Sequence, residues 1–547
     1  MEKKKKPAAR MENKKRPAAR MEKKKKPAAR ADDQAVRHMD VRRALGVITR
    51  GFVLCMFVIH ALSISGNYMQ IRYKQRVYVL LLTLMAAATL LVLFYQAAQG
   101  RRPGFGFKKW AKCIKIHEYM LLGYWAVMLL SALLSPYQEN VWLGVTRPEG
   151  FWLQSAYIAS FFMISRFYKP DERDMLVYVS VMALISVYGV FQYYGLDFLE
   201  LAPEEFYGPK LLLFSTINNR NVASTLLVMA FGFGVVMFTQ KSKKRDWAYF
   251  VCALILFYAL LITDTESGYV GLLLAGALSL ALLVRDRHMA ARLCALFACF
   301  FALLFINGSV YPLLQTGWEG WFAPWPFGGL LAIAPYAAGA FAAAAALFKF
   351  LKVKTPKISG KVWRRGWPVL FIALLVLLCA CMPVIAGATQ LRSFDELNEM
   401  LHGNIEDTFM SNRAYIWSRA LTLVPDRPLI GHGPDAFEAA FKVFYDESAE
   451  LFGVYFDKAH SEWVQALVDV GALGFAALMG FYGALFYAAR KKTGNTFTLA
   501  LGFAMLVYVI QAAFNFATPV AHPIVWTVWG VFGARIQNDD ESELPAI

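Results

Sequence analysis

Residues 411–437 read SNRAYIWSRALTLVPDRPLIGHGPDAF, and residues 459–475 read AHSEWVQALVDVGALGF. Both belong to one long polar segment that lies between apolar runs, and they decide how the rest of the chain is interpreted. A polar loop held by a rigid apolar scaffold is where chemistry is expected. The side chains that could carry chemistry there are Arg413, His432, Asp435, Asp457, His460 and Glu462.

The remainder of the chain is strongly apolar. Hydrophobic residues make up 58% of its 547 residues, above the roughly 45–50% of soluble proteins. The excess falls in runs of about 17–23 residues, long enough to cross a ~30 Å hydrocarbon core. These runs predict an all-α polytopic integral membrane protein with about fourteen transmembrane helices. The predicted spans are 47–66, 77–97, 118–135, 151–167, 174–195, 222–240, 247–263, 268–284, 289–307, 328–348, 367–387, 463–489, 496–515 and 519–535.

Basic residues alternate between the predicted loops, which indicates an orientation. The even-numbered loops are rich in Lys and Arg, as at 241–245, whereas most short odd-numbered loops are nearly free of them. The first loop, with Arg72, Lys74 and Arg76, is the exception. Because basic loops stay in the cytoplasm, both termini are predicted to be cytoplasmic. The long segment 388–462, between spans 11 and 12, is then a large extracytoplasmic helical loop.

The N-terminus is a basic repeat. Residues 1–30 are three similar decapeptides with charges of +4, +3 and +4, and a segment of this composition is expected to be disordered. It would lie against anionic membrane lipids, and without interleaved aromatic residues it is not expected to bind nucleic acid. The predicted organisation is a disordered polybasic cytoplasmic leader at 1–45, transmembrane helices 1–11 at 46–387, the extracytoplasmic loop at 388–462, helices 12–14 at 463–535 and a cytoplasmic tail at 536–547.

The predicted outer face gathers polar residues from distant parts of the chain. The third loop, WLGVTRPEGFW, presents Arg147 and Glu149, and the fifth ends in FSTINNRNVAS, with Asn219, Arg220 and Asn221 at a helix start. Together with Arg413, these loops place arginines at three sites on one side. Because arginine binds phosphate oxygens in a bidentate manner and stays charged, the pattern suggests a pocket for a phosphorylated, lipid-borne substrate.

Each of these residues also has a purely structural interpretation. The tryptophans of the ninth loop, Trp318, Trp321 and Trp325, are better explained as an aromatic belt than as a substrate platform. The other structural alternatives are interfacial anchoring for Arg147 and Arg220, helix capping for Asn219, Asn221 and Asp435, solvent exposure for Arg413, and turn formation for His432.

His460 is the strongest candidate for a catalytic group. It stands at the start of a membrane helix, where the helix dipole disfavours the imidazolium form and favours a neutral base. Such a base could take a proton from an acceptor hydroxyl. Glu462 and Asp457 are both candidates to orient it, and an interfacial polar residue is the structural alternative.

Three motifs carry a family resemblance: R-x-x-x-W at Arg413–Trp417, PLIGHGPDAF at Pro428–Phe437, and H-x10-G from His460 to Gly471. In their order and spacing the chain resembles the O-antigen ligase-related superfamily of polytopic membrane glycosyltransferases. The resemblance implies a protein of the bacterial cytoplasmic membrane that moves a glycan from an undecaprenyl-diphosphate carrier to an acceptor hydroxyl on the outer side. It also implies inversion of the anomeric centre with neither metal nor cofactor.

The resemblance assigns roles to particular residues. His460 would be the base, and Arg413, Arg147 and Arg220 would bind the diphosphate. Family members often carry Ser-Arg in a short loop where this chain has Thr265-Glu266-Ser267-Gly268, so an expected arginine is absent there. The residues expected to support the site are Asn219, Asn221, Glu149, His432, Asp435, Glu462 and Gly471.

Other functions remain open from the sequence. A polymerase of the same superfamily would join the glycan to another carrier-linked repeat, whereas a ligase would join it to an acceptor glycan, lipid or protein. A transporter or flippase of polyprenyl-linked sugar would place its ionisable groups near the bilayer midplane, and here they gather at one face. A metal site built from His432, Asp435, Asp457 and His460 fits no standard ligand spacing.

Overall fold

The computed structural model describes residues 26–65, 70–99, 114–194, 196–201, 214–240, 246–263, 265–315, 332–350, 392–516 and 518–537, with parts of 369–389. Every regular element in these ranges is a helix, in agreement with the predicted all-α class. The first helices are α1 (Lys26–Cys55), which continues as a π-helical turn at Met56–His60, α2 (Gln70–Ala98), α4 (Ile116–Leu134), α5 (Gln138–Val141), α6 (Phe151–Phe167) and α7 (Glu172–Tyr193). After a 3-10 turn at Ser215–Ile217 come α8 (Arg220–Gln240), α9 (Asp246–Thr263), α10 (Glu266–Leu283), α11 (Arg287–Gln315) and α13 (Ala334–Phe350).

The polar segment also folds into helices. They are α16 (Arg392–Leu401), α17 (Phe409–Leu423), α18 (Phe437–Phe441) and α19 (Tyr445–Phe452), with 3-10 turns at Val424–Asp426 and Lys442–Phe444. Helix α15 (Met382–Thr389) precedes them and lies mainly at the end of predicted span 367–387. The chain then returns to long apolar helices, namely α20 (Glu462–Ala489), α21 (Thr496–Ala512) and α22 (His522–Gln537).

Eight helices of the described ranges are long and apolar enough to cross a membrane. Shorter apolar helices and α6 and α22 lie where further spans are predicted, so the number fourteen stays a prediction of the sequence. Span 367–387 is described only in part, because several of its residues before position 379 lie outside the described ranges. The eight are Val41–His60, Gln70–Ala98, Ile116–Leu134, Glu172–Tyr193, Arg220–Gln240, Asp246–Thr263, Arg287–Ser309 and Glu462–Ala489.

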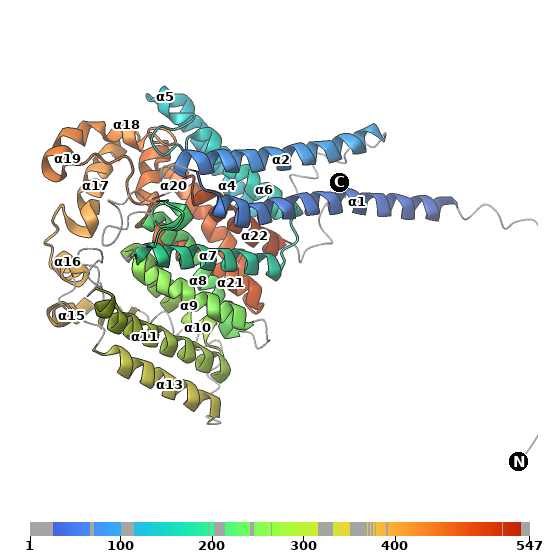
Figure 1. Ribbon diagram of the computed structural model, residues 1–547. Helices are drawn as coiled ribbons and strands as arrows, with labels where there is room; N and C mark the ends of the chain where they lie inside the picture. The colour runs from blue at the N-terminus through green and yellow to red at the C-terminus, as the bar shows by residue number, and fades with distance from the viewer. Residues whose placement is uncertain are drawn as a thin grey trace, which may run out of the picture.

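Helix α8 forms the centre of the bundle (Figure 1). Its side chains from Val222 to Thr239 are all buried, because α7, α9, α10, α11 and α21 pack around it. A helix that is apolar on every side is stable only when it is surrounded in this way. Around this centre α20 packs against α4, and α22 packs against α6.

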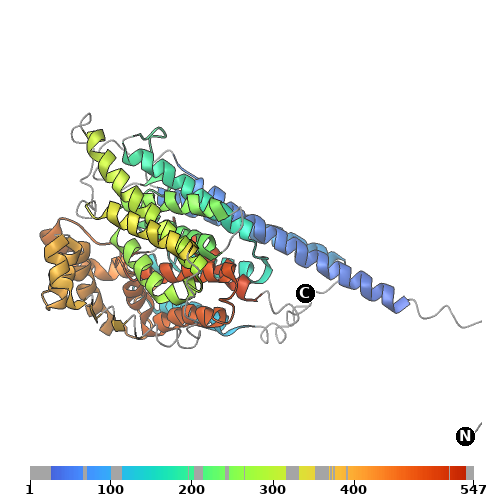
Figure 2. The same ribbon diagram turned by 90° about the horizontal axis from the view of Figure 1, so that it is seen from below.

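Helices α16–α19 gather at one end of the bundle, and the N-terminal part of α1 extends from the other (Figures 1 and 2). Helix α1 begins at Lys26, inside the segment 1–45 predicted to be a disordered leader, and residues 1–25 lie outside the described ranges. Several basic loops used for the orientation, and the ninth-loop tryptophans, also lie outside them. Which side of a membrane each end faces therefore remains a prediction.

Candidate functional site

His460 lies in the loop that enters α20. Its backbone adopts a left-handed conformation, with φ of 52°, and strained conformations of this kind cluster at functional sites. Nδ1 lies 3.0 Å from the carbonyl oxygen of Lys458. A carbonyl can only accept a hydrogen bond, so Nδ1 carries the proton and Nε2 keeps its lone pair. The Lys458 carbonyl therefore orients the ring, and neither Glu462 nor Asp457 does so.

The surroundings of His460 keep it neutral. Burial, followed by the positive charges of Arg413 and Arg147, lowers its pKa from the ordinary 6.5 to about 4. The same two arginines were expected near this histidine, and their charges act on it here. The imidazole is consequently unprotonated across the physiological pH range.

Phe516 joins Arg147 to His460. The guanidinium carbon of Arg147 lies 4.5 Å from the centre of the Phe516 ring, and the His460 ring lies 4.9 Å from it at an angle of 71°. Arg147 also pairs with Asp457, with 2.9 Å between Nε and Oδ2. An arginine over an aromatic face is held in place while its charge is kept. We call Arg147, Arg413, His460 and Phe516 the arginine cluster.

Arg413 is attached to the same loop. Its Nε donates to the carbonyl of Phe514 at 3.1 Å, and Nη1 donates to the carbonyl of Met410 at 2.7 Å. The side chain is buried, which contradicts the solvent-exposed alternative. Burial lowers its pKa, and the negative charge of Glu266 opposes that change. Glu266 stands in the short loop where the resemblance leads one to expect an arginine, so this chain places an acidic group beside Arg413.

The R-x-x-x-W motif has a direct structural reason. Trp417 lies one helical turn after Arg413, on the same face of α17. Its indole N–H donates to the carbonyl of Ala459 at 2.9 Å, and its ring packs 6.1 Å from that of Phe514. The two motif residues thus hold the His460 loop and the Phe514–Phe516 loop against each other.

The other two motifs meet at a backbone crossing. Gly471 interrupts α20 with φ of 65°, and Gly431 also has a positive φ. A methyl group on Gly471 would overlap backbone atoms of Leu429 and Ile430. The loop and the kink are joined by hydrogen bonds from His432 N to Val468 O (2.9 Å), Gly433 N to Asp469 O (2.8 Å) and Ala472 N to Pro428 O (2.8 Å). Gly471 is therefore required by the crossing.

His432 is part of the loop's scaffold. Its side chain is buried, with Nε2 2.9 Å from the carbonyl of Leu423. Its own carbonyl accepts from the hydroxyl of Ser135. It does not line the cavity described below. This arrangement agrees with the turn-forming alternative.

The Asn219–Asn221 stretch reaches the site indirectly. Asn219 caps α8, because its side chain accepts from the backbone N–H groups of Asn221 and Val222 at 2.9 and 3.1 Å. The side-chain amide of Asn515 donates to the carbonyl of Asn221 at 2.8 Å, and the Asn515 carbonyl accepts from Glu462 N at 2.9 Å. Arg220 is half-exposed and makes no hydrogen bond or ion pair within the described ranges.

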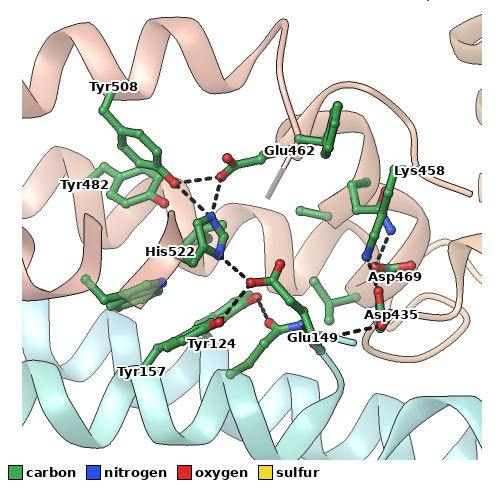
Figure 3. A pocket seen from close by; sticks show the side chains of 17 residues that line it. Tyr124, Glu149, Tyr157, Asp435, Lys458, Glu462, Asp469, Tyr482, Tyr508 and His522 are labelled. Atoms are coloured by element: carbon green, nitrogen blue, oxygen red, sulfur yellow. Dashed lines mark hydrogen bonds and ion pairs between the residues drawn. The ribbon is translucent and has the colours of Figure 1, made fainter. Parts of the chain in front are cut away.

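Glu149 belongs to a second, acidic group of residues (Figure 3). Its carboxylate accepts from the Tyr157 hydroxyl at 2.9 Å and lies 3.2 Å from Nδ1 of His522. Nε2 of the same histidine lies 3.4 Å from Glu462, which also accepts from Tyr508 at 2.7 Å. Burial raises the pKa of Glu149, but the charges of His522 and Lys458 outweigh it and hold the value below its usual range.

Asp435 lies in the same group and does not cap a helix. It is buried, with φ of 60°, and its carboxylate pairs with the buried ammonium of Lys458. It also accepts from the backbone N–H of Glu149 at 3.0 Å. Burial raises the pKa of Asp435 despite Lys458. Burial would lower the pKa of Lys458, but Asp435 and Glu149 raise it, so the lysine stays charged.

Several of these residues are missing from the candidates named in the sequence. Phe514, Asn515 and Phe516 lie in the turn between α21 and α22. Lys458 stands two residues before His460, and His522 begins α22 just after that turn. The turn is an odd-numbered loop by the predicted topology, on the same side as Arg147. That position was the available signal, although a few residues between two apolar runs look like an ordinary interfacial turn.

No group of three or more His, Cys, Asp or Glu side chains in the described ranges is arranged to hold a metal ion. The residues weighed for a metal site from the sequence are His432, Asp435, Asp457 and His460. The first of these lies in the loop scaffold, and Asp435 and Asp457 pair with Lys458 and Arg147.

Comparison with known families identifies this region. Residues 327–479 match the family model described as O-antigen ligase. The chain carries an O-antigen ligase domain. No curated protein matches the chain. The match confirms the resemblance indicated by the three motifs, and the O-antigen ligase domain contains Arg413, Asp435, His460 and Gly471. Arg147 and the Phe514–Phe516 turn lie outside the matched segment, yet they complete the arginine cluster.

The O-antigen ligase domain, together with the apolar helices, shows that this is a membrane protein. The family points to a glycosyltransferase-type enzyme of the ligase or polymerase kind. It also implies, in general terms, a lipid-linked glycan donor and an acceptor.

Proposed function

We propose that this protein transfers a glycan from an undecaprenyl-diphosphate carrier to an acceptor hydroxyl on the outer face of the bacterial cytoplasmic membrane. The observation that carries the proposal is the arginine cluster: Arg147 and His460 share the Phe516 ring, and Arg413 is bonded to the same turn. A neutral base beside two fixed cations suits a reaction that expels an anionic diphosphate.

This geometry supports a direct displacement. Nε2 of His460 takes the proton of the acceptor hydroxyl while the oxygen attacks the anomeric carbon. The bond between that carbon and the diphosphate oxygen breaks, and its electron pair leaves with the diphosphate. Attack opposite the leaving group inverts the anomeric centre. The guanidinium groups of Arg147 and Arg413 neutralise the charge that develops, which makes a metal-independent mechanism sufficient. The proton on His460 then passes to water.

Binding of the donor changes the electrostatics around His460. Two arginines beside His460 disfavour the imidazolium that forms during transfer. A bound diphosphate offsets their charge, so the base becomes stronger once the donor is in place. Donor binding therefore prepares the histidine for the acceptor.

Glycan analysis distinguishes the ligase from the polymerase. Mass spectrometry of surface and carrier-linked glycans from cells lacking this protein is the direct measurement. Long carrier-linked chains with a bare acceptor support the ligase, whereas shortened chains support a polymerase of the same superfamily.

A reconstituted assay tests the transfer chemistry itself. The protein in proteoliposomes should consume carrier-linked donor and form a glycosidic bond. Donor that crosses the bilayer without bond formation, with no effect of His460→Ala, would instead support a flippase.

A further inference from the structure

Figure 3 shows the side chains that line a small cavity. The cavity has a volume of about 80 Å³. Phe516 forms part of its wall, and the same ring contacts Arg147 and His460 of the arginine cluster. The cavity has room for several water-sized groups. Four carboxylates line this acidic cavity, those of Glu149, Asp435, Glu462 and Asp469, and the cations that line it are Lys458 and His522.

The charges of the acidic cavity do not balance. Lys458 pairs with Asp435. His522 places one ring nitrogen 3.2 Å from Glu149 and the other 3.4 Å from Glu462. Contact with a carboxylate on both sides favours the imidazolium form, in which both nitrogens donate. The four carboxyl groups therefore outnumber the two cations, and negative charge that is buried without a partner is costly.

Asp469 shows where a partner is missing. Its Oδ2 accepts from the side-chain amide of Gln465 at 2.9 Å and from the backbone N–H of Asp435 at 3.2 Å. Its Oδ1 is buried and accepts no hydrogen bond from any described residue, and the residue as a whole is only 6% exposed. Because Asp469 lines the cavity, a hydrogen-bond donor placed there would satisfy this oxygen.

We propose that the acidic cavity binds the ammonium group of an amino sugar carried by one of the two transfer substrates. The inference rests on the proposed function, since the cavity shares Phe516 with the arginine cluster. An ammonium group supplies both the missing donor and the missing positive charge, whereas a hydroxyl supplies only the donor. A phosphate would be repelled by the carboxylates and is directed to Arg147 and Arg413.

The aromatic lining suits the same ligand. Tyr482 and Trp526 also line the cavity. Aromatic faces attract cations. Glu149 and Lys458 line the cavity, while Arg147 and His460, each two residues away along the chain, belong to the arginine cluster. A sugar residue whose ammonium occupies the cavity would thus lie beside the reacting groups.

Direct binding of simple sugars tests this inference. The full-length protein in nanodiscs would be titrated with glucosamine, N-acetylglucosamine and glucose at neutral pH, and binding followed through the shift in unfolding temperature. Glucosamine should bind about 10- to 100-fold more tightly than the two uncharged sugars, as expected for a charge-assisted hydrogen bond in a buried site. Equal affinity for the three sugars, or no saturable binding of glucosamine, would overturn the proposal.

A variant locates the binding. Asp469→Asn keeps the shape of the side chain but removes its charge, and it should abolish the preference for glucosamine. An unchanged preference would show that the sugar binds elsewhere and would overturn the assignment. If this variant does not insert into membranes, the comparison of the three sugars still tests the proposal, because it uses the unmodified protein.

A second measurement separates this inference from the proposed function. His460→Ala should lose transfer but keep its preference for glucosamine, because His460 does not line the cavity. If the unmodified protein transfers glycan but shows no preference for glucosamine, the cavity assignment is refuted and the proposed transfer function is not. In the transfer assay, glucosamine that competes with the acceptor assigns the amino sugar to the acceptor, and competition with the donor assigns it to the donor.

Discussion

The arginine cluster and the acidic cavity are neighbours made from the same short stretches of chain, yet they carry opposite charge. Arg147 and His460 belong to the cluster, and Glu149 and Lys458 line the cavity. Each loop therefore contributes one residue to each site. Phe516 contacts the cluster and forms a wall of the cavity. The comparison shows that residues only two positions apart in the chain can belong to sites of opposite charge. The net charge of +18 for the whole chain does not reveal this local separation.

The strongest way to break this comparison is to remove the base. His460→Ala should lower glycan transfer by about 10²–10⁴-fold, the usual contribution of a positioned general base. Transfer would be measured in proteoliposomes with a carrier-linked donor. His402→Ala is the matched control, since His402 is an exposed histidine at the end of α16. Full transfer by a stably inserted His460→Ala protein would refute the catalytic role.

Removing a cation tests the other half of the cluster. Arg147→Ala or Arg413→Ala should reduce transfer by roughly 10²–10³-fold, as expected for the loss of one group that stabilises a developing anion. Lysine at either position should restore only part of the rate, because it lacks the bidentate geometry. The rate constants would be compared with those of Arg173→Ala, which alters an exposed arginine at the start of α7. An equal loss in that control would point to a general effect on the protein.

The backbone crossing that positions both sites is tested at Gly471. Gly471→Ala should destabilise the protein by about 1–3 kcal/mol from the backbone conformation alone, since φ of 65° with ψ of −173° is adopted essentially only by glycine. The loss should be larger still because the methyl group overlaps the chain at Leu429 and Ile430. The measurement is thermal unfolding of the purified protein. Gly483→Ala lies in the same helix, with no atom within 4 Å of the added methyl group, and should leave stability nearly unchanged. Similar unfolding temperatures for the two variants would contradict the crossing.

The pH dependence gives the smallest but most specific effect. His460 acts as a base only when neutral, and its pKa of about 4 lies below the ordinary 6.5. For kcat/KM, which reports the free enzyme, the activity should therefore hold as the pH falls through 6.5 and decline only near 4. In Arg147→Gln one cation is lost, so the pKa of His460 should rise and the acid limb should move to higher pH. An acid limb at 6.5 in both proteins would refute this electrostatic coupling.

The same argument applies to stability. Because the pKa of His460 is lower in the folded protein than in the unfolded chain, the unfolded state binds more protons between pH 6.5 and about 4. This group therefore makes the folded protein less stable as the pH falls through that window. The Arg147→Gln variant should lose less stability over the same range.

The sequence located the helices and several candidate site residues because those features are local. Apolar runs of membrane length predict helices from composition alone, and α8, α20 and α21 lie where such runs occur. Arg413, His460 and Gly471 were identifiable because their motifs interrupt that composition. The capping role of Asn219 was also foreseeable, since Asn before a helix commonly accepts hydrogen bonds from its first N–H groups.

Contacts between distant segments were not predictable in this way. Phe516 and Lys458 look ordinary in sequence, and His522 stands in an apolar run more than sixty residues after His460. Only the packing of α20, α21 and α22 brings them to Arg147 and Glu149. The sequence by itself determined an all-helical membrane chain with a histidine and arginines in polar loops. The tertiary structure decided which of them meet, because the charge and burial of each group depend on neighbours that are hundreds of residues away along the chain.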